Sequence, residues 1–191
     1  MMNEAEVRQL FIETGAILEG HFLLTSGLHS PLYVEKFQVL QYPKHTEKLC
    51  AALAERFTND NIELVVGPVT GGIILAHEVG KHLGTRAIFT ERENGKMALR
   101  RGFVIEQGQR VLIVEDIVTT GGSVKEVIDV VREHGGIPVA VGMLVDRSGG
   151  KADFGIPAQA LLHLTIPTYQ PDDCPLCKEG IVLTKRGSRK L

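Results

Sequence analysis

The sequence predicts an α/β protein with a parallel β-sheet, helices on both faces and a small irregular β element at the N-terminus. Short runs of β-branched and aliphatic residues alternate with longer segments of helical periodicity. Several short runs are continuously apolar, as expected for strands that are covered on both faces. Apolar residues make up 43% of the 191 residues, which is enough to form the core of one domain.

The N-terminal part of the chain differs from the rest. Apolar residues at helical spacing predict an amphipathic helix over residues 3–14. Residues 15–40 are rich in glycine and aromatic residues and predict a small β lid packed on the main domain. Pro43 suits the first turn of a helix that continues to about residue 57. The expected parts are therefore residues 1–40, a core over residues 41–170 and an extension over residues 171–191.

The core should contain five strands and two further helices. Strands are expected at residues 64–68, 85–91, 110–115, 138–145 and 160–166, with helices at residues 71–83 and 123–133. The polar residues 93–102 predict a mobile loop. Ligands of open α/β sheets bind beyond the carboxyl ends of the strands. One crevice should therefore be surrounded by residues 68–72, 91–101, 115–123 and 146–150.

The bulk properties exclude several classes of protein. A net charge of −2 does not favour a nucleic-acid or membrane partner. No apolar run approaches the roughly 20 residues that span a bilayer, and the acidic N-terminus does not resemble a signal peptide. Three cysteines fit a reducing compartment, so we expect a cytoplasmic location.

The segment after the predicted strand at 110–115 carries the clearest chemical signal. Two carboxylates, Glu115 and Asp116, precede a loop rich in threonine and glycine, and the whole segment reads Glu115, Asp116, Ile117, Val118, Thr119, Thr120, Gly121, Gly122 and Ser123. Backbone N–H groups at a helix N-terminus bind anions, and hydroxyl groups add donors. The segment lacks the Gly-Lys-Ser/Thr of a Walker loop and the glycine spacing of a dinucleotide turn.

The acidic pair restricts the ligand. Carboxylates beside a phosphate would repel it, unless they hold ribose hydroxyls or a hydrated Mg²⁺ that carries a pyrophosphate. A ribose with a 5′-phosphate and a 1-pyrophosphate satisfies both features. The structural alternative is a strand-to-helix turn capped by threonine and serine.

This segment resembles the 5-phosphoribosyl 1-diphosphate (PRPP) motif of the type I phosphoribosyltransferases. From the N-terminus to about residue 170 the chain looks like the family members that act on orotate. The resemblance implies that Glu115 and Asp116 hold the ribose hydroxyls, and that residues 119–123 bind the 5′-phosphate. Ile117 and Val118 are also among the expected PRPP-binding residues. It also implies a homodimer, a type I phosphoribosyltransferase fold and Mg²⁺ that is carried by the diphosphate substrate.

Three other segments fit the same family. The turn that contains Thr70 and Gly71 matches its pyrophosphate loop, and residues 19–33 are similar to its hood over the base. Arg147 matches the arginine that pairs with the orotate carboxylate, while Thr119 would also touch the base. Without the family, these segments could be an ordinary turn, a packed hairpin and a surface ion pair between Arg147 and Asp146.

The chain departs from the family pattern at three places. Thr25 stands where many members have a hood lysine, and Gly71 stands where many have a lysine in the pyrophosphate loop. The catalytic loop is short and lacks histidine, which leaves Arg92 and Lys96 as the first candidates for catalytic cations, followed by Arg100 and Arg101. The PRPP motif itself is unchanged, so these differences bear on base specificity and rate. A solvated charged turn is the structural alternative for the loop.

The chain also contains the pair Cys174-Pro-Leu-Cys177. A structural zinc site needs four ligands, for which Cys50 and His163 are conceivable partners. Two reduced thiols in a turn is the interpretation that we favour here, and no metal ligand is assigned.

The predicted reaction is phosphoribosyl transfer from PRPP to orotate, with Asp116, Arg92 and Lys96 as catalytic residues. One alternative is a phosphoribosyltransferase for another nucleobase. A second alternative is a regulator of the same fold that senses a ligand without catalysis, although the sequence shows no helix-turn-helix and no basic face.

Overall fold

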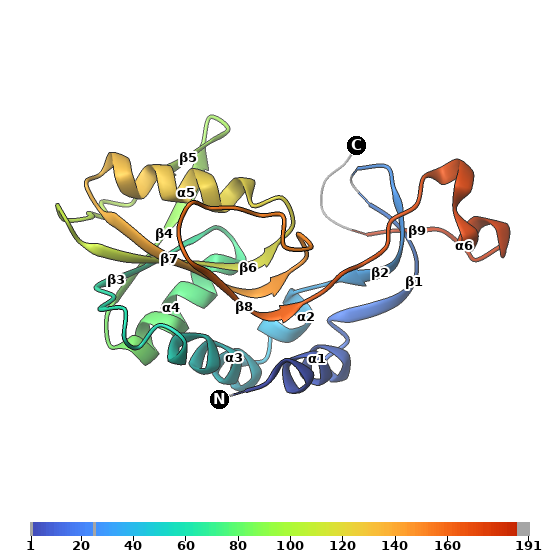
Figure 1. The fold of residues 1–191 in the computed structure, drawn as a ribbon, viewed down its shortest axis with the longest axis horizontal. Helices are drawn as coiled ribbons and strands as arrows, with labels where there is room; N and C mark the ends of the chain where they lie inside the picture. The colour runs from blue at the N-terminus through green and yellow to red at the C-terminus, as the bar shows by residue number, and fades with distance from the viewer. Residues whose placement is uncertain (1, 25, 187–191) are drawn as a thin grey trace.

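The computed structural model describes residues 2–24 and 26–186. Thr25, one of the three departures from the family pattern, lies outside these residues. The chain forms a six-stranded sheet flanked by helices, and a separate three-stranded sheet at one side (Figure 1). No helix in the described part combines the length and apolarity needed to cross a bilayer.

The small sheet joins the two ends of the chain. Helix α1 (Glu4–Glu13) begins with a capping box, in which Asn3 and Glu6 bond each other's backbone N–H groups. Strands β1 (Ile17–Leu23) and β2 (His29–Val34) pair antiparallel, and β9 (Thr184–Lys185) pairs parallel with β1. We call β1, β2 and β9 the hood sheet. Figure 1 shows the red C-terminal segment running beside these blue strands.

The large sheet has the order β5-β4-β3-β6-β7-β8. All neighbouring strands are parallel except the pair β4 and β5. The strands are β3 (Leu64–Pro68), β4 (Arg86–Glu93), β5 (Lys96–Leu99), β6 (Arg110–Val118), β7 (Ile137–Asp146) and β8 (Ala158–His163). The chain order reverses between β3 and β6, and ligands of such sheets bind beyond the strand ends at this switch point.

Helices cover both faces of the large sheet, as the apolar strands predicted. The remaining helices are α2 (Phe37–Leu40), α3 (Pro43–Glu55), α4 (Gly71–Leu83), α5 (Gly122–Glu133), the 3₁₀ helix η1 (Pro171–Asp173) and α6 (Pro175–Lys178). Leu112 and Val114 pack with α1, α3 and α4, while Val111 and Ile113 face α5. Because successive side chains of a strand point to opposite faces, both sides of β6 are buried. These findings confirm the predicted α/β fold.

Two predictions near the crevice were wrong, and the strand predicted at residues 160–166 also ends earlier, since β8 spans Ala158–His163. The predicted mobile loop over residues 93–102 contains strand β5, which pairs with the end of β4. Asn94 and Gly95 form its two-residue turn with positive φ angles of 51° and 82°, as hairpin turns of the Asn-Gly type require. Strand β6 was expected to end at Glu115, but it continues to Val118 because Ile117 pairs with Val145 of β7.

Candidate active site

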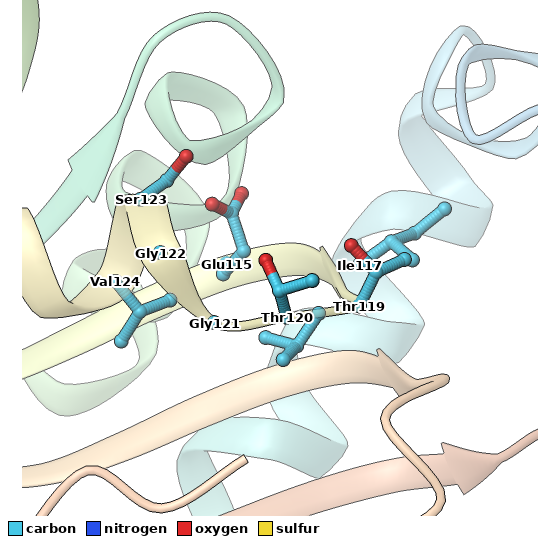
Figure 2. Close-up of a pocket in the computed structure, with 9 residues that line it drawn as sticks. Glu115, Ile117, Thr119, Thr120, Gly121, Gly122, Ser123 and Val124 are labelled. Carbon is cyan, nitrogen blue, oxygen red and sulfur yellow. The ribbon is translucent and has the colours of Figure 1, made fainter. Parts of the chain in front are cut away.

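The PRPP-like segment forms a pocket where β6 ends and α5 begins. Its lining consists of Glu115, Ile117, Val118, Thr119, Thr120, Gly121, Gly122, Ser123 and Val124. Figure 2 shows the carboxylate of Glu115 and the hydroxyls of Thr120 and Ser123 on the same side of the loop. The first N–H groups of a helix lack partners within the helix and bind anions. The pocket therefore presents an anion site at one end and a carboxylate at the other.

Gly121 is needed at the turn into α5 for two reasons. Its φ angle of 78° lies in the left-handed region, which favours glycine. A Cβ atom there would also lie 2.8 Å from the ring of Phe154. The turn into α5 therefore requires a residue without a side chain at position 121.

A second helix N-terminus lies on the other side of the acidic pair. Thr70 is the N-cap of α4, and a cis peptide bond joins it to Val69. The turn is tight, because a Cβ atom on Gly67 would lie 2.2 Å from the carbonyl oxygen of Gly72. The N-termini of α4 and α5 thus follow β3 and β6, the strands at the switch point. Two anion sites flanking two carboxylates match a sugar with a phosphate at each end.

The two carboxylates have different environments. Asp116 is only 2% exposed, and its oxygens lie 2.9 and 2.7 Å from Nζ of Lys36. Burial raises the pKa of Asp116, and the ion pair with Lys36 opposes that shift. Glu115 is half-buried and accepts a bond from the backbone N–H of Asp116, at 3.0 Å. Glu115 therefore remains the carboxylate that faces the pocket.

The Lys36–Asp116 pair explains the glycine at position 71. A Cβ atom on Gly71 would lie 1.8 Å from Oδ2 of Asp116. This carboxylate cannot move aside easily because Lys36 holds both of its oxygens. A lysine at position 71 does not fit while this pair exists, and Lys36 brings a cation to the same place. The sequence alone did not point to Lys36, because a single lysine before a short helix forms no motif.

The pKa of Glu115 leads to a prediction about stability. Burial, and next the charge of Asp116, raises this pKa from 4.5 to about 8. Between these two pH values the folded protein keeps a proton that the unfolded chain has released, so stability falls as pH rises through that window. We expect Glu115→Gln to raise the melting temperature of the ligand-free protein above about pH 8 by roughly a few degrees.

This gain should shrink toward pH 4.5, where both states hold the proton. Thermal melts of the two proteins across this range measure the difference. Glu133→Gln, an exposed change on α5, is the matched control and should leave the profile unchanged. A constant difference at every pH would contradict the pKa shift.

Arg147 lies next to the pocket loop. Its backbone N–H donates to the carbonyl of Val118 at 2.8 Å. Its Nε is buried and has no hydrogen-bond partner among the described residues. Burial lowers the pKa of this guanidinium, and the nearby Tyr33 of the hood sheet opposes the shift. Such a group is suited to receive a carboxylate from a ligand.

Arg147 and Asp146 do not form the ion pair that was the structural alternative. Asp146 instead accepts a bond from the backbone N–H of Ser148, at 2.7 Å. This bond closes a local turn and leaves the guanidinium of Arg147 available.

The candidate catalytic cations lie on the β4–β5 hairpin, beside α5. Arg92 pairs with Glu126 at 2.8 Å and donates to the carbonyl of Gly95. Lys96 lines a surface pocket together with acidic residues of α5, namely Glu126, Asp129 and Glu133. Neither residue lines the PRPP-like pocket of its own chain. Their catalytic role therefore stays a prediction.

Glutamates of the hairpin pair with the other two cations. Arg101 makes two bonds to Glu91, at 2.8 and 3.0 Å, and Arg100 lies 2.6 Å from Glu93. These pairs fasten the strand β4 to the segment that follows β5.

Known proteins share both the sequence and the fold of this chain. Residues 38–154 match the model of the phosphoribosyl transferase domain family. An orotate phosphoribosyltransferase of Desulforamulus reducens is 54% identical over 190 residues, covering 100% of both chains. The enzyme of that name from Thermotoga maritima is 49% identical over 185 residues, covering 97% of this chain and 99% of the relative.

Solved structures agree with the sequence relatives. The crystal structure of orotate phosphoribosyltransferase from Aeropyrum pernix has a TM-score of 0.71 and 26% identity, and the match covers 83% of this chain and 93% of that chain. An adenine phosphoribosyltransferase from Rhodothermus marinus has a TM-score of 0.59 and 25% identity, covering 69% and 86%. The full-length matches, together with the two helix N-termini beside Glu115 and Asp116, lead to one assignment: this chain belongs to the orotate phosphoribosyltransferases of the phosphoribosyl transferase domain family.

Proposed function

We propose that this protein transfers the phosphoribosyl group of PRPP to orotate, giving orotidine 5′-phosphate and diphosphate in pyrimidine nucleotide biosynthesis. The observation that carries this proposal is Arg147, whose buried Nε has no partner beside the PRPP-like pocket. Orotate bears a carboxylate on its ring, and a planar guanidinium binds that group through two parallel bonds. Tyr33 of the hood sheet lies near Arg147, so in this proposal the base would bind between Arg147 and the hood sheet.

PRPP would bind across the switch point of the large sheet. Its 5′-phosphate would meet the N–H groups at the start of α5 and the hydroxyls of Thr119, Thr120 and Ser123. Its diphosphate would meet the start of α4 at Thr70 and Gly71. The ribose hydroxyls would then lie against Glu115 and Asp116, which separate the two anion sites.

The reaction breaks the bond between C1 of the ribose and the diphosphate oxygen, and forms a bond from C1 to a ring nitrogen of orotate. Positive charge develops on the ribose as diphosphate leaves. Glu115 and Asp116 fix the sugar and favour that charge, while Lys36 lies beside the diphosphate end. The protein contributes mainly by positioning two reactants, which is a large effect for a bimolecular reaction.

Mg²⁺ would enter with the diphosphate and neutralise part of its negative charge. Hard cations of this kind prefer oxygen ligands. The carboxylate of Glu115 fits this role, since it faces the pocket and does not bond to Lys36.

We further propose that the protein is a cytoplasmic homodimer, and that Arg92 and Lys96 act in the active site of the partner subunit. Both residues lie on the β4–β5 hairpin beside α5 and outside the pocket of their own chain. A hairpin that reaches across a dimer would bring two cations to the leaving diphosphate and exclude water from the ribose cation. In the same proposal, residues 1–40 form the hood over the base.

Loss of the ultraviolet absorbance of orotate, with PRPP and Mg²⁺, tests the function directly. We expect Mg²⁺-dependent loss by the unmodified protein, and a lower turnover with retained PRPP binding for Lys96→Ala. Consumption of another nucleobase but not of orotate would overturn the substrate assignment. Binding of PRPP without turnover of any base would favour the alternative of a ligand-sensing regulator.

A further inference from the structure

Four potential metal ligands meet between the hood sheet and the C-terminal extension. They are His21, His29, Cys174 and Cys177, and their ligand atoms all lie within 4.8 Å of one another. Nε2 of His21 is 2.9 Å from Nδ1 of His29, 3.6 Å from Sγ of Cys174 and 3.8 Å from Sγ of Cys177. Sγ of Cys177 is 3.3 Å from Nδ1 of His29. A tetrahedral zinc ion with bonds of about 2.1 Å to nitrogen and 2.3 Å to sulfur separates its ligand atoms by roughly 3.3–3.8 Å.

The fold assembles these ligands from opposite ends of the chain. His29 pairs across the hairpin with Leu23, so His21, two residues before Leu23, lies on the same face. A bulge between Glu19 and Phe22 adjusts the direction of His21, as bulges commonly do. Cys174 precedes α6 and Cys177 lies within it, so the helix presents both sulfurs to the histidines. His21, His29 and Cys174 are 3%, 5% and 1% exposed, while Cys177 is exposed.

Hydrogen bonds alone do not account for the arrangement. Nδ1 of His21 lies 2.8 Å from the carbonyl oxygen of Ile181, which accepts only if Nδ1 carries a proton. Nε2 of a neutral His21 then has one lone pair, yet one nitrogen and two sulfurs converge on it. A lone pair accepts one proton, so at most one of these three neighbours can donate to Nε2. A cation at the centre satisfies all four atoms, and a carbonyl that holds the outer nitrogen is typical of histidine ligands.

The surrounding lobe also needs a stabilising element. Among the described residues, none between 18 and 33 and none after residue 166 belongs to either apolar core of the molecule. Within the hood sheet itself, the ring of Phe22 packs against that of Tyr33, with centroids 5.6 Å apart. Small lobes without a core are commonly stabilised by a metal ion.

We propose that His21, His29, Cys174 and Cys177 bind one structural Zn²⁺ that fastens the C-terminal extension to the hood sheet. Two thiolates and two imidazoles in a closed tetrahedron favour zinc over magnesium or calcium, which prefer oxygen ligands. This site is separate from the PRPP-like pocket and does not depend on the proposed reaction.

The partners differ from those that the sequence suggested. Cys50 is a residue of α3 that is buried in the core, and His163 lies on the surface, 3.6 Å from a carboxylate oxygen of Glu4. A second group, formed by Glu47, Glu78 and His82, is different in kind, because Lys81 pairs with both of its glutamates, at 3.0 and 3.2 Å. Glu47, Glu78 and Lys81 form a surface ion-pair cluster, and we assign no metal to this group.

Metal analysis of the purified full-length protein tests the site. We expect about one zinc ion per chain after removal of loosely bound metal. The double variant Cys174→Ser, Cys177→Ser should contain almost none. His163→Ala and Cys50→Ala are matched controls that remove the other candidate ligands, and both should retain the metal.

A second measurement does not depend on the folding of any variant. Zinc is removed from the unmodified chain with a chelator, and Co²⁺ is added in its place. Charge transfer from thiolate to Co²⁺ and intense tetrahedral d–d bands are expected, together with a melting temperature that falls without metal and recovers when zinc is restored. Absence of both zinc and the Co²⁺ spectrum would overturn the proposal. A Cys174–Cys177 disulfide, or unchanged zinc in the double cysteine variant, would overturn it equally.

Discussion

Replacing Arg147 by alanine is expected to lower kcat/KM for orotate roughly 100-fold, which corresponds to about 3 kcal/mol. The backbone N–H of Arg147 donates to the carbonyl of Val118, and its buried Nε has no hydrogen-bond partner among the described residues. Without it, the orotate carboxylate would enter a desolvated site with no counter-charge. Most of the loss should appear in KM for orotate, since PRPP contacts other residues.

Two variants make this prediction specific. Arg147→Lys keeps the charge but cannot form two parallel bonds, so it should recover only part of the activity. Arg132→Ala, an exposed arginine on α5, should behave like the unmodified protein. Steady-state rates over a range of orotate concentrations separate these cases. An unchanged KM for orotate in Arg147→Ala would remove the residue from the base site.

The double variant Glu115→Gln, Asp116→Asn is expected to lose at least roughly 100-fold in kcat/KM while remaining folded. Hydrogen bonds from hydroxyls to charged groups contribute about 1.5–3 kcal/mol each, and the variant weakens two of them. It also removes the negative charge that favours a cationic ribose. Binding of Mg²⁺-PRPP should weaken together with turnover, because the ribose hydroxyls lose their charged acceptors.

Asp129→Asn with Glu133→Gln is the matched control, since it changes the same two residue types on the exposed face of α5. Circular dichroism checks the fold, and calorimetric titration with PRPP separates binding from chemistry. Full turnover by the Glu115→Gln, Asp116→Asn variant would exclude the acidic pair from the reaction. If turnover is lost as expected, Glu115 illustrates stability given up for function, because Glu115→Gln alone is expected to stabilise the ligand-free protein above about pH 8.

The sequence predicted the features that local patterns encode. Continuous apolar runs such as residues 64–68 and 111–114 identified strands buried on both faces, and the loop rich in threonine and glycine preceded the start of α5. The PRPP-like segment was recognisable because carboxylates, hydroxyls and glycines lie within one short stretch. A strand followed by a helix N-terminus has little conformational freedom, so the order of residues fixes most of that pocket.

The two boundary errors arose because each strand end depends on pairing with a neighbouring strand. Strand β5 was missed because its hairpin is charged and exposed, although Asn94-Gly95 is a typical two-residue turn. Strand β6 extended to Val118 because β7 offers hydrogen-bond partners beyond Glu115. In both cases, hydrogen bonds to a neighbouring strand set where the strand lies. The sequence of a segment does not reveal which strand will be its neighbour.

By itself, the sequence determined the α/β class, the phosphate-binding turn and the candidate residues Glu115, Asp116 and Arg147. Tertiary structure alone decided which groups meet across long separations. Lys36 reaches Asp116 from 80 positions away, and Cys174 reaches His21 from 153 positions away. The physical reason is that a motif needs residues that are close in sequence, whereas an ion pair or a metal site needs only atoms that are close in space.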